Sequence, residues 1–218
     1  MFYWDDFIAD IQKTLRPGDW VLDAGSGDGH WRDHLPKNIH YVGFDLGVGD
    51  KAVDYSHLDA KVDLIALPLK AACFDAVISI QVLEHMKKPW IMLDEVSRVL
   101  KPGGVLYLTC PQGEPQHQTP YDFFRYTPYG LRSLLEERGF EIEFLIPQKG
   151  DFAKLGNDIA HAAKAMAARG PLAKVASLYA RALYKVHAPL LKRLDAWPEL
   201  QKNPIGHFVR ARRLAAAH

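Results

Sequence analysis

The stretch 21-VLDAGSGDGH-30 could bind a ligand through its backbone, because glycines follow an apolar run at every second position: Gly25, Gly27 and Gly29. Glycines between a strand and a helix allow close approach to a nucleotide-like ligand. The pattern is not the dinucleotide spacing G-x-G-x-x-G, since position 30 is His, and the Gly-Lys-Ser/Thr of a P-loop is missing. Asp23 and Asp28 add carboxylates, which disfavour a phosphate and favour a cation.

S-adenosylmethionine is such a ligand, with an adenosine, an ammonium and a sulfonium but no phosphate. The stretch D-A-G-S-G-D-G resembles motif I of the class I S-adenosylmethionine-dependent methyltransferases. The resemblance covers about residues 18–146, and a final strand near 205–213 would complete the sheet. It implies an α/β fold with a doubly wound, mostly parallel seven-stranded sheet, an antiparallel last strand and a helical insert before that strand. It also implies a cofactor site made by Asp23, Gly25, Ser26, Gly27, Asp45, Leu46, Asp63, Leu64 and Gln81.

The later cofactor residues fall in the order of the family. Asp45 ends 41-YVGFDLG-47, where the family's acid takes both ribose hydroxyls, and a vicinal diol suits a charged acceptor. In 62-VDLIALPLK-70, Asp63 would accept from the exocyclic amine and Leu64 would contact the adenine ring; a purely structural Asp63 is the alternative. Gln81 would line the methionine end of the cofactor.

His85 is the first candidate for catalysis, in 80-IQVLEHM-86. Some quinone O-methyltransferases carry Glu-Val-Leu-Glu-His here and bind a divalent metal with it. Because Gln81 replaces the first acid, we expect no metal site. His85 is then either a general base or a capping and packing residue.

The second candidate is the loop 117-HQTPYDFFRYT-127, which is rich in aromatic and charged residues. It resembles loops of methyltransferases often associated with glycan and lipid-linked sugar modification. We predict a catalytic or substrate-contacting His117 and substrate contacts from Tyr121, Arg125 and Tyr126. Alternatively, Asp122 and Arg125 pair with each other and only fix the loop. Methyl transfer mainly needs alignment, which can contribute roughly 7–11 kcal/mol.

Strands and helices alternate along the first two thirds of the chain, which is typical of a doubly wound sheet. Apolar runs predict strands at Trp20–Ala24, Tyr41–Asp45, Val62–Ala66, Asp75–Ile80, Val105–Cys110 and Phe140–Ile146. Helical sequence is expected after the glycine loop and from Pro89 to about residue 100. A further helix has Thr127 as N-cap, Pro128 at its first position and Gly139 at its end.

A change in composition divides the expected single domain 1–218. Residues 1–17 form a helix that is either a lid over the cofactor or a packing element, and residues 18–150 form the cofactor-binding core. Residues 151–204 form a helical insert that we expect to cover the acceptor. Residues 1–151 carry 15 Lys and Arg against 23 Asp and Glu, whereas residues 152–218 carry 12 against 3. The basic end suits an anionic acceptor or an anionic membrane surface.

Composition narrows the functional class. Cys73 and Cys110 do not have the spacing of a metal site or a redox pair. The first residues lack the basic region of a signal peptide, and no apolar run is long enough to span a bilayer. We therefore expect a cytoplasmic protein, which would be peripheral to the membrane if residues 152–200 bind one. The acidic body argues against nucleic acid. We predict methyl transfer to a small, glycan- or lipid-linked acceptor. One rival function is a non-catalytic cofactor-binding or membrane-associated scaffold. The other is a nicotinamide-dependent oxidoreductase, against which His30 argues, because it stands in place of the third dinucleotide glycine. The sequence does not indicate an oligomeric state.

Overall fold

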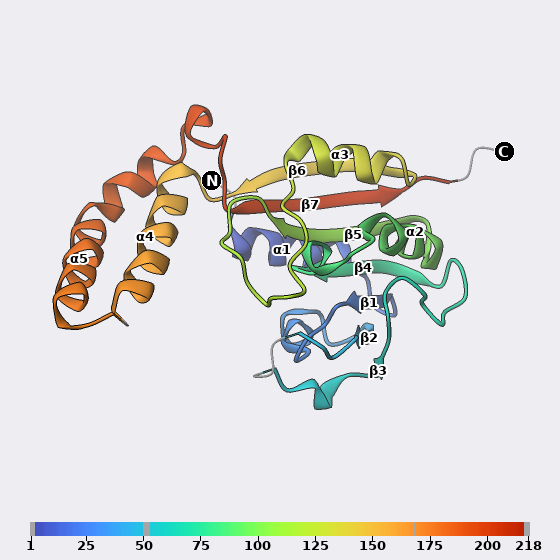
Figure 1. The fold of residues 1–218 in the computed structure, drawn as a ribbon. Coiled ribbons are helices and arrows are strands. Elements are labelled where there is room, and N and C mark those ends of the chain that lie inside the picture. The colour runs from blue at the N-terminus through green and yellow to red at the C-terminus, as the bar shows by residue number, and fades with distance from the viewer. Residues whose placement is uncertain (1–2, 50–52, 168, 216–218) are drawn as a thin grey trace.

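A computed structural model describes residues 3–49, 53–167 and 169–215, which form one seven-stranded sheet and its flanking helices (Figure 1). The strands are Trp20–Ala24 (β1), His40–Asp45 (β2), Ala60–Lys61 (β3), Phe74–Ile80 (β4), Leu100–Pro111 (β5), Phe140–Gln148 (β6) and Gly206–Arg213 (β7). Their order is β3-β2-β1-β4-β5-β7-β6, and β7 runs antiparallel to both neighbours. The predicted mostly parallel sheet with an antiparallel last strand is confirmed.

One helix precedes the first strand, and the others lie in connections between strands. They are Trp4–Thr14 (α1), Pro89–Val99 (α2), Pro128–Glu136 (α3), Asp151–Ala167 (α4) and Pro171–Leu194 (α5), with short 3₁₀ turns at His30–His34 (η1), Tyr55–His57 (η2), Leu83–His85 (η3) and Pro198–Leu200 (η4). Thr127 caps α3 as predicted, since its hydroxyl accepts a hydrogen bond from the Gly130 amide at 3.1 Å. Within the described ranges, no helix is both long and apolar enough to cross a membrane.

Alternating residues of the central strands point to the two faces of the sheet, where they form separate cores. On one face, Leu106 and Leu108 pack with the apolar stripes of α2 and α3. On the other, Tyr107 packs with Phe7 and Ile11 of α1. The packing role expected for the N-terminal helix is therefore present; Met1 and Phe2 of the predicted 1–17 segment lie outside the described residues.

Two predicted elements differ in the structure. The strand expected at Val62–Ala66 is only Ala60–Lys61, because the Asp63 carboxylate accepts a hydrogen bond from the Ile65 amide and bends the chain into a turn. The helix expected after the glycine loop is the 3₁₀ turn η1. Leu35 follows it in an extended conformation (φ −96°, ψ 158°), because Leu35 precedes Pro36 and the residue before a proline is disfavoured in helical geometry.

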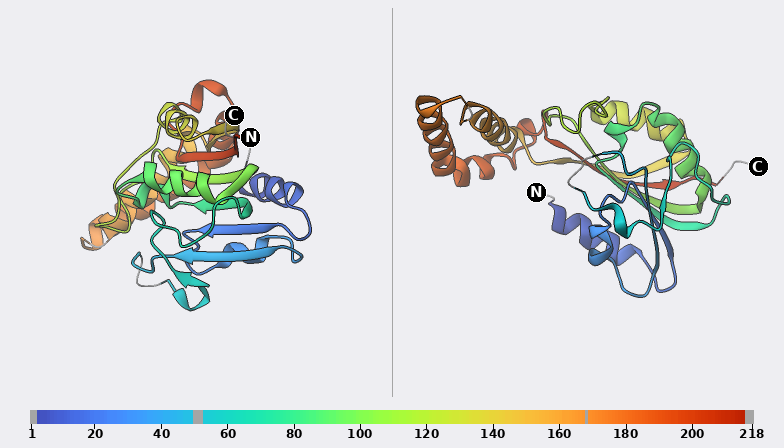
Figure 2. Two further views of the ribbon diagram at one scale, coloured as in Figure 1. Left: turned by 90° about the vertical axis from the view of Figure 1, so that its right-hand side faces the viewer. Right: turned by 60° about the horizontal axis from the view of Figure 1, so that its bottom comes forward.

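The insert is a helical hairpin that projects from one end of the sheet (Figures 1 and 2). Its two helices, α4 and α5, pack on each other, and Gly156 leaves room for the Tyr184 ring between them. The buried Asp195 carboxylate accepts the Phe152 and Ala153 amides at 2.8 Å each, which caps the start of α4. The hairpin leaves the sheet where β5 and β6 end, at Pro111 and Gln148, both of which pair with Gly206.

Candidate functional site

A cavity of about 630 Å³ opens at the carboxyl ends of the parallel strands, where ligands bind in doubly wound sheets. Of the predicted site residues, it is lined by Gly25, Ser26, Gly27, Asp45, Leu46, Asp63, Leu64, Gln81, His85 and Tyr121. Its lining comes entirely from residues 25–123 among those described, so the insert does not cover it. The expectation of an acceptor-covering insert is wrong for this structure, because α4 and α5 pack on each other and project from the sheet.

The glycine loop is held tightly against the second strand. The amides of Gly25 and Ser26 both donate to the Phe44 carbonyl, at 2.7 and 3.0 Å. Gly25 has a φ of +89°, and Gly27 has a φ of +57°, with no heavy atom of residues 3–49, 53–167 or 169–215 within 4 Å of an added Cβ. The loop thus uses positive φ to expose backbone to open space above Gly27, as a ligand cradle requires.

Asp45 joins the glycine loop to the end of β2. Its two carboxylate oxygens accept the amides of Gly27 at 3.0 Å and Gly47 at 2.7 Å. Each carboxylate oxygen keeps a second acceptor site. Asp45 is therefore placed both to shape the loop and to accept a pair of ligand hydroxyls.

The remaining predicted cofactor residues border the cavity farther along the sheet. Leu64 is buried and forms an apolar wall beside Asp63. Gln81 adopts a positive φ of 55°, an uncommon backbone state for a residue other than glycine. Its side-chain amide donates to the Thr109 hydroxyl at 3.1 Å, which holds this backbone at the cavity.

Asp23 lies beneath the loop and does not line the cavity. Its side chain is fully buried, and its Oδ2 accepts the Tyr41 hydroxyl at 2.6 Å, while its Oδ1 has no hydrogen-bond partner among the described residues. Burial raises the pKa of Asp23 to about 7, although the hydrogen bond from Tyr41 acts in the opposite direction.

This buried carboxyl makes the stability of the ligand-free chain depend on pH. The folded chain holds the proton more tightly than the unfolded chain, so the free energy of unfolding falls as the pH rises from about 4 to about 7. We expect Asp23→Asn to remove this fall and to gain up to about 3 kcal/mol on the wild type between pH 4.5 and pH 8, measured by urea unfolding. The exposed Asp33→Asn is the control; an equal change in both variants contradicts the prediction.

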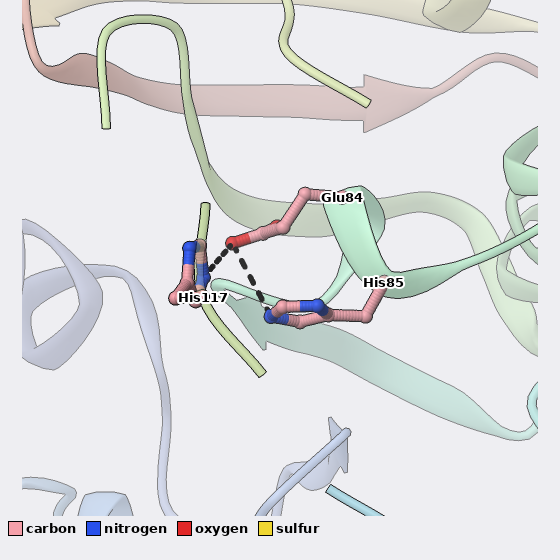
Figure 3. A group of neighbouring side chains, drawn as sticks. All are labelled: Glu84, His85 and His117. Atoms are coloured by element: carbon pink, nitrogen blue, oxygen red, sulfur yellow. Dashed lines mark ion pairs between the residues drawn. The ribbon is translucent and has the colours of Figure 1, made fainter. Parts of the chain in front are cut away.

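The most unusual feature beside the cavity is a cluster of three side chains, Glu84, His85 and His117 (Figure 3). The Glu84 Oε1 atom lies 3.9 Å from the Nε2 atom of each histidine. Burial raises the pKa of Glu84 to about 8 and lowers the pKa of His85. Glu84 and His85 are neighbours in the sequence, whereas His117 lies 32 positions after His85 and comes beside them only because the fold brings its loop to η3.

A guanidinium fixes the loop that carries His117. Arg125 donates to both oxygens of Asp122, at 2.6 and 2.8 Å, and holds the pKa of Asp122 at about 2. The same Asp122 accepts the His117 amide at 2.9 Å. Arg125 also donates to three carbonyls, those of Glu114, Pro115 and Phe124.

Two predicted substrate contacts are therefore corrected. All five N–H donors of Arg125 are used within its own loop, so it has none left for a substrate and acts as a positioning residue. Tyr126 is buried and donates its hydroxyl to the Leu83 carbonyl at 2.9 Å, which removes it from the cavity. Tyr121 does line the cavity, together with Phe123, which the sequence did not single out.

Comparison with known proteins agrees with this geometry. Residues 22–108 match the family model described as a methyltransferase domain. The chain carries a class I S-adenosylmethionine-dependent methyltransferase domain. A relative from Mycolicibacterium smegmatis, named a "probable S-adenosylmethionine-dependent methyltransferase", is 34% identical over 137 residues, which cover 56% of this chain and 52% of the relative. The chain thus spans about half the length of the curated relatives it matches.

Two solved structures share the fold. The Haemonchus contortus phosphoethanolamine N-methyltransferase 2, solved with S-adenosyl-L-methionine, aligns with a TM-score of 0.58 at 17% identity, over 97% of this chain and 53% of that one. The [4+2]-cyclase SpnF aligns with a TM-score of 0.60 at 21% identity, over 97% and 80%. The methyltransferase fold therefore occurs in proteins named for different reactions, so the fold alone does not determine the chemistry of this domain.

Proposed function

We propose that this chain transfers a methyl group from S-adenosylmethionine to a small acceptor presented at an anionic membrane surface. The observation that carries the transfer reaction is the juxtaposition of two features at one cavity. An open glycine loop with carboxylates forms one wall, and the Glu84, His85 and His117 cluster adjoins the other.

The loop suits this cofactor. Space above Gly27 is open, and the Oγ atom of Ser26, which lines the cavity, has no hydrogen-bond partner in the described ranges. This hydroxyl and the Asp28 carboxylate of the same cavity lining suit a ligand with an ammonium group, and Asp45 has acceptor sites for a diol. S-adenosylmethionine, when bound, supplies an electrophilic methyl group; the chain has to align the acceptor with it and receive the acceptor's proton.

The acceptor side of the cavity is aromatic and basic. Tyr121 and Phe123 line it, with Lys87 and Lys88 beside them. The Lys87 ammonium lies 5.7 Å from the centre of the Phe123 ring. Two lysines suit an anionic acceptor. The Nε2 atom of His85, next to Glu84, lies where a proton lost by the acceptor can be received, directly or with the help of a cation.

The hairpin supports a membrane as the source of the acceptor. Exposed apolar residues recur every three or four positions along α5: Leu172, Val175, Tyr179, Leu183, Val186 and Leu190. Leu172 is 84% and Val186 73% exposed, so the stripe is unpartnered among the described residues. The helix has basic residues but no Asp or Glu. An apolar face on a basic helix is typical of a segment that lies in an anionic membrane interface.

The hairpin is also suitably placed, since it leaves the sheet at the ends of β5 and β6, the same edge at which the cavity opens. Its base is tied to that edge by a hydrogen bond of 3.0 Å from Asn157 to Glu114, just before the His117 loop. A membrane bound by α5 would thus lie on the side of the molecule from which the acceptor enters.

One experiment tests both the methyl transfer and the presentation of the acceptor at a membrane. The chain is incubated with methyl-labelled S-adenosylmethionine and vesicles made from a total bacterial lipid extract that contains anionic phospholipid. We expect co-sedimentation with the vesicles and label in the organic phase. The triple variant Leu172→Gln, Val175→Gln, Val186→Gln should bind vesicles at least about tenfold more weakly, because it loses buried apolar area, whereas Tyr129→Gln, an equally exposed side chain on α3, should not.

The rival functions give different results. Label only in water-soluble products would keep the methyltransferase and refute the membrane-presented acceptor. Vesicle binding without label transfer, in a chain that binds the cofactor, would favour the non-catalytic scaffold. Binding of NADH in place of the cofactor would favour an oxidoreductase, against which the Asp28–His30 contact of 2.6 Å at the position of the third dinucleotide glycine already argues.

A further inference from the structure

The three side chains beside the cavity have their acceptor atoms turned toward one another (Figure 3). Both oxygens of Glu84 and the Nε2 atom of His85 are buried, and none of them has a hydrogen-bond partner within the part of the chain that the structure describes. Glu84 is fully buried, with no exposed surface. The Glu84 carboxylate faces the two ring nitrogens at 3.9 Å, which is longer than a hydrogen bond, so these buried polar atoms do not satisfy one another's hydrogen-bonding capacity.

The backbone determines the protonation of both rings. The Nδ1 atom of His85 lies 2.5 Å from the Tyr121 carbonyl, and the Nδ1 atom of His117 lies 3.1 Å from the Pro115 carbonyl. A carbonyl can only accept, so each Nδ1 is the donor and each neutral ring has a lone pair on Nε2. Two nitrogen lone pairs and a carboxylate then point at one place. This is the donor set of a cation site, and ring nitrogens held by backbone carbonyls are typical of metal-binding histidines.

The geometry points to a binding site for a divalent transition-metal ion of the zinc type, with Glu84, His85 and His117 as its three protein ligands. We propose this metal site although the sequence predicted none, because Gln81 replaces the first glutamate of the metal-binding pattern Glu-Val-Leu-Glu-His. The sequence suggested ligands from the segment before Glu84; the fold supplies His117 from another loop instead.

The distances fit such a site after a small closure. Bonds of 2.0–2.2 Å to one tetrahedral ion place its ligand atoms about 3.4 Å apart. Here the ligand atoms of the three residues all lie within 4.8 Å of one another. Closure by at most about 0.7 Å per side chain therefore suffices.

Three protein ligands leave one position open, which is the arrangement of catalytic rather than structural zinc sites. His85 lines the cavity, so the open position can be reached from it. A metal ion at this site would lower the pKa of an acceptor hydroxyl or thiol bound at the open position. The metal site does not depend on the proposed function; only this use of it does.

The test uses the full chain without a polyhistidine tag, stripped of metal by a chelator and then titrated with Zn²⁺ and Co²⁺. We expect one equivalent of Zn²⁺ at micromolar or better affinity and a visible Co²⁺ absorption band of the intensity that tetrahedral sites give. Glu84→Gln keeps the shape of the buried side chain, and His117→Ala changes a half-exposed one; each should weaken binding by about 100-fold or more, equivalent to about 2.8 kcal/mol. His161→Ala, on the exposed side of α4, is the matched control.

The outcomes separate the alternatives. No stoichiometric metal with the wild type, or binding equally weakened by His161→Ala, overturns the site. Binding unaffected by His117→Ala in a variant that unfolds at the wild-type temperature also overturns it and leaves the cluster as a proton relay. If the chain binds stoichiometric metal but transfers label to no acceptor, the metal site stands and the proposed methyltransferase function is refuted. If the metal-free chain transfers label, the proposed function stands and a role of the metal in the reaction is refuted.

Discussion

Replacement of Asp45 by Ala is expected to reduce the binding of S-adenosylhomocysteine by at least about 100-fold. Two effects act together. The ligand loses a charged acceptor for its diol, and hydrogen bonds to charged groups contribute about 1.5–3 kcal/mol each. The glycine loop also loses the bonds that its Gly27 amide and the neighbouring Gly47 amide donate to the carboxylate. Isothermal calorimetry measures the change, with NADH as the control titrant.

Two variants separate these effects. Asp45→Asn retains one acceptor oxygen, so it should hold part of the loop while it loses the charge, and its affinity should fall between those of the wild type and Asp45→Ala. Asp33→Ala removes an exposed carboxylate of η1 whose distance to Lys37 is 3.8 Å and should leave affinity unchanged. If Asp45→Ala binds as well as Asp33→Ala does, the cavity is not the cofactor site.

The fold could be predicted because its elements are determined locally. Buried strands such as Trp20–Ala24 and a capped helix such as Pro128–Glu136 depend on residue types within a few positions. The prediction of a strand at Val62–Ala66 was wrong because a side chain forms a local hydrogen bond that the apolar pattern does not indicate. Asp63 folds its own carboxylate onto the next turn and ends β3 early, although Val62–Ala66 reads as an apolar strand.

That most of the predicted cofactor residues line one cavity could be predicted for the same reason, since strand ends and glycine turns bring their residues to one end of the sheet. The reaction side could not. Whether Arg125 faces a substrate depends on how many carbonyls surround it, and whether His117 meets Glu84 depends on how two loops pack. Tyr126 shows the same limit, because its burial follows from a bond to Leu83 that lies 43 positions away.

The projecting hairpin shows what burial adds to a sequence pattern. The spacing of Leu172 and Val175 predicts an amphipathic helix, and such a stripe ordinarily packs on a core. In the structure α5 instead packs on α4 through small residues and Tyr184, and the apolar stripe faces outward. A soluble domain seldom exposes a continuous apolar face without a partner. We therefore assign to a membrane-binding surface the residues that the sequence pattern alone would place in a core.

The second large effect concerns Gly25. Its φ of +89° is unfavourable for any residue with a side chain, and an added Cβ would lie 2.3 Å from a methyl carbon of Val82. Gly25→Ala should therefore combine backbone strain of about 1–2 kcal/mol with overpacking of about 1–3 kcal/mol and lower the free energy of unfolding by roughly 2–5 kcal/mol. Urea unfolding measures the loss, and the displaced loop should no longer bind S-adenosylhomocysteine.

Gly18 provides the matched control, because its φ of +86° is nearly the same but no atom in the described part of the chain lies within 4 Å of its added Cβ. Gly18→Ala should lose only the strain, and cofactor binding should stay. Gly27→Ala tests the cradle itself, since its added Cβ meets open space in the ligand-free chain; it should cost little more stability than Gly18→Ala yet weaken cofactor binding. Equal stability losses in Gly18→Ala and Gly25→Ala would mean that Val82 moves aside, and unchanged binding in Gly27→Ala would mean that the ligand does not lie against this loop.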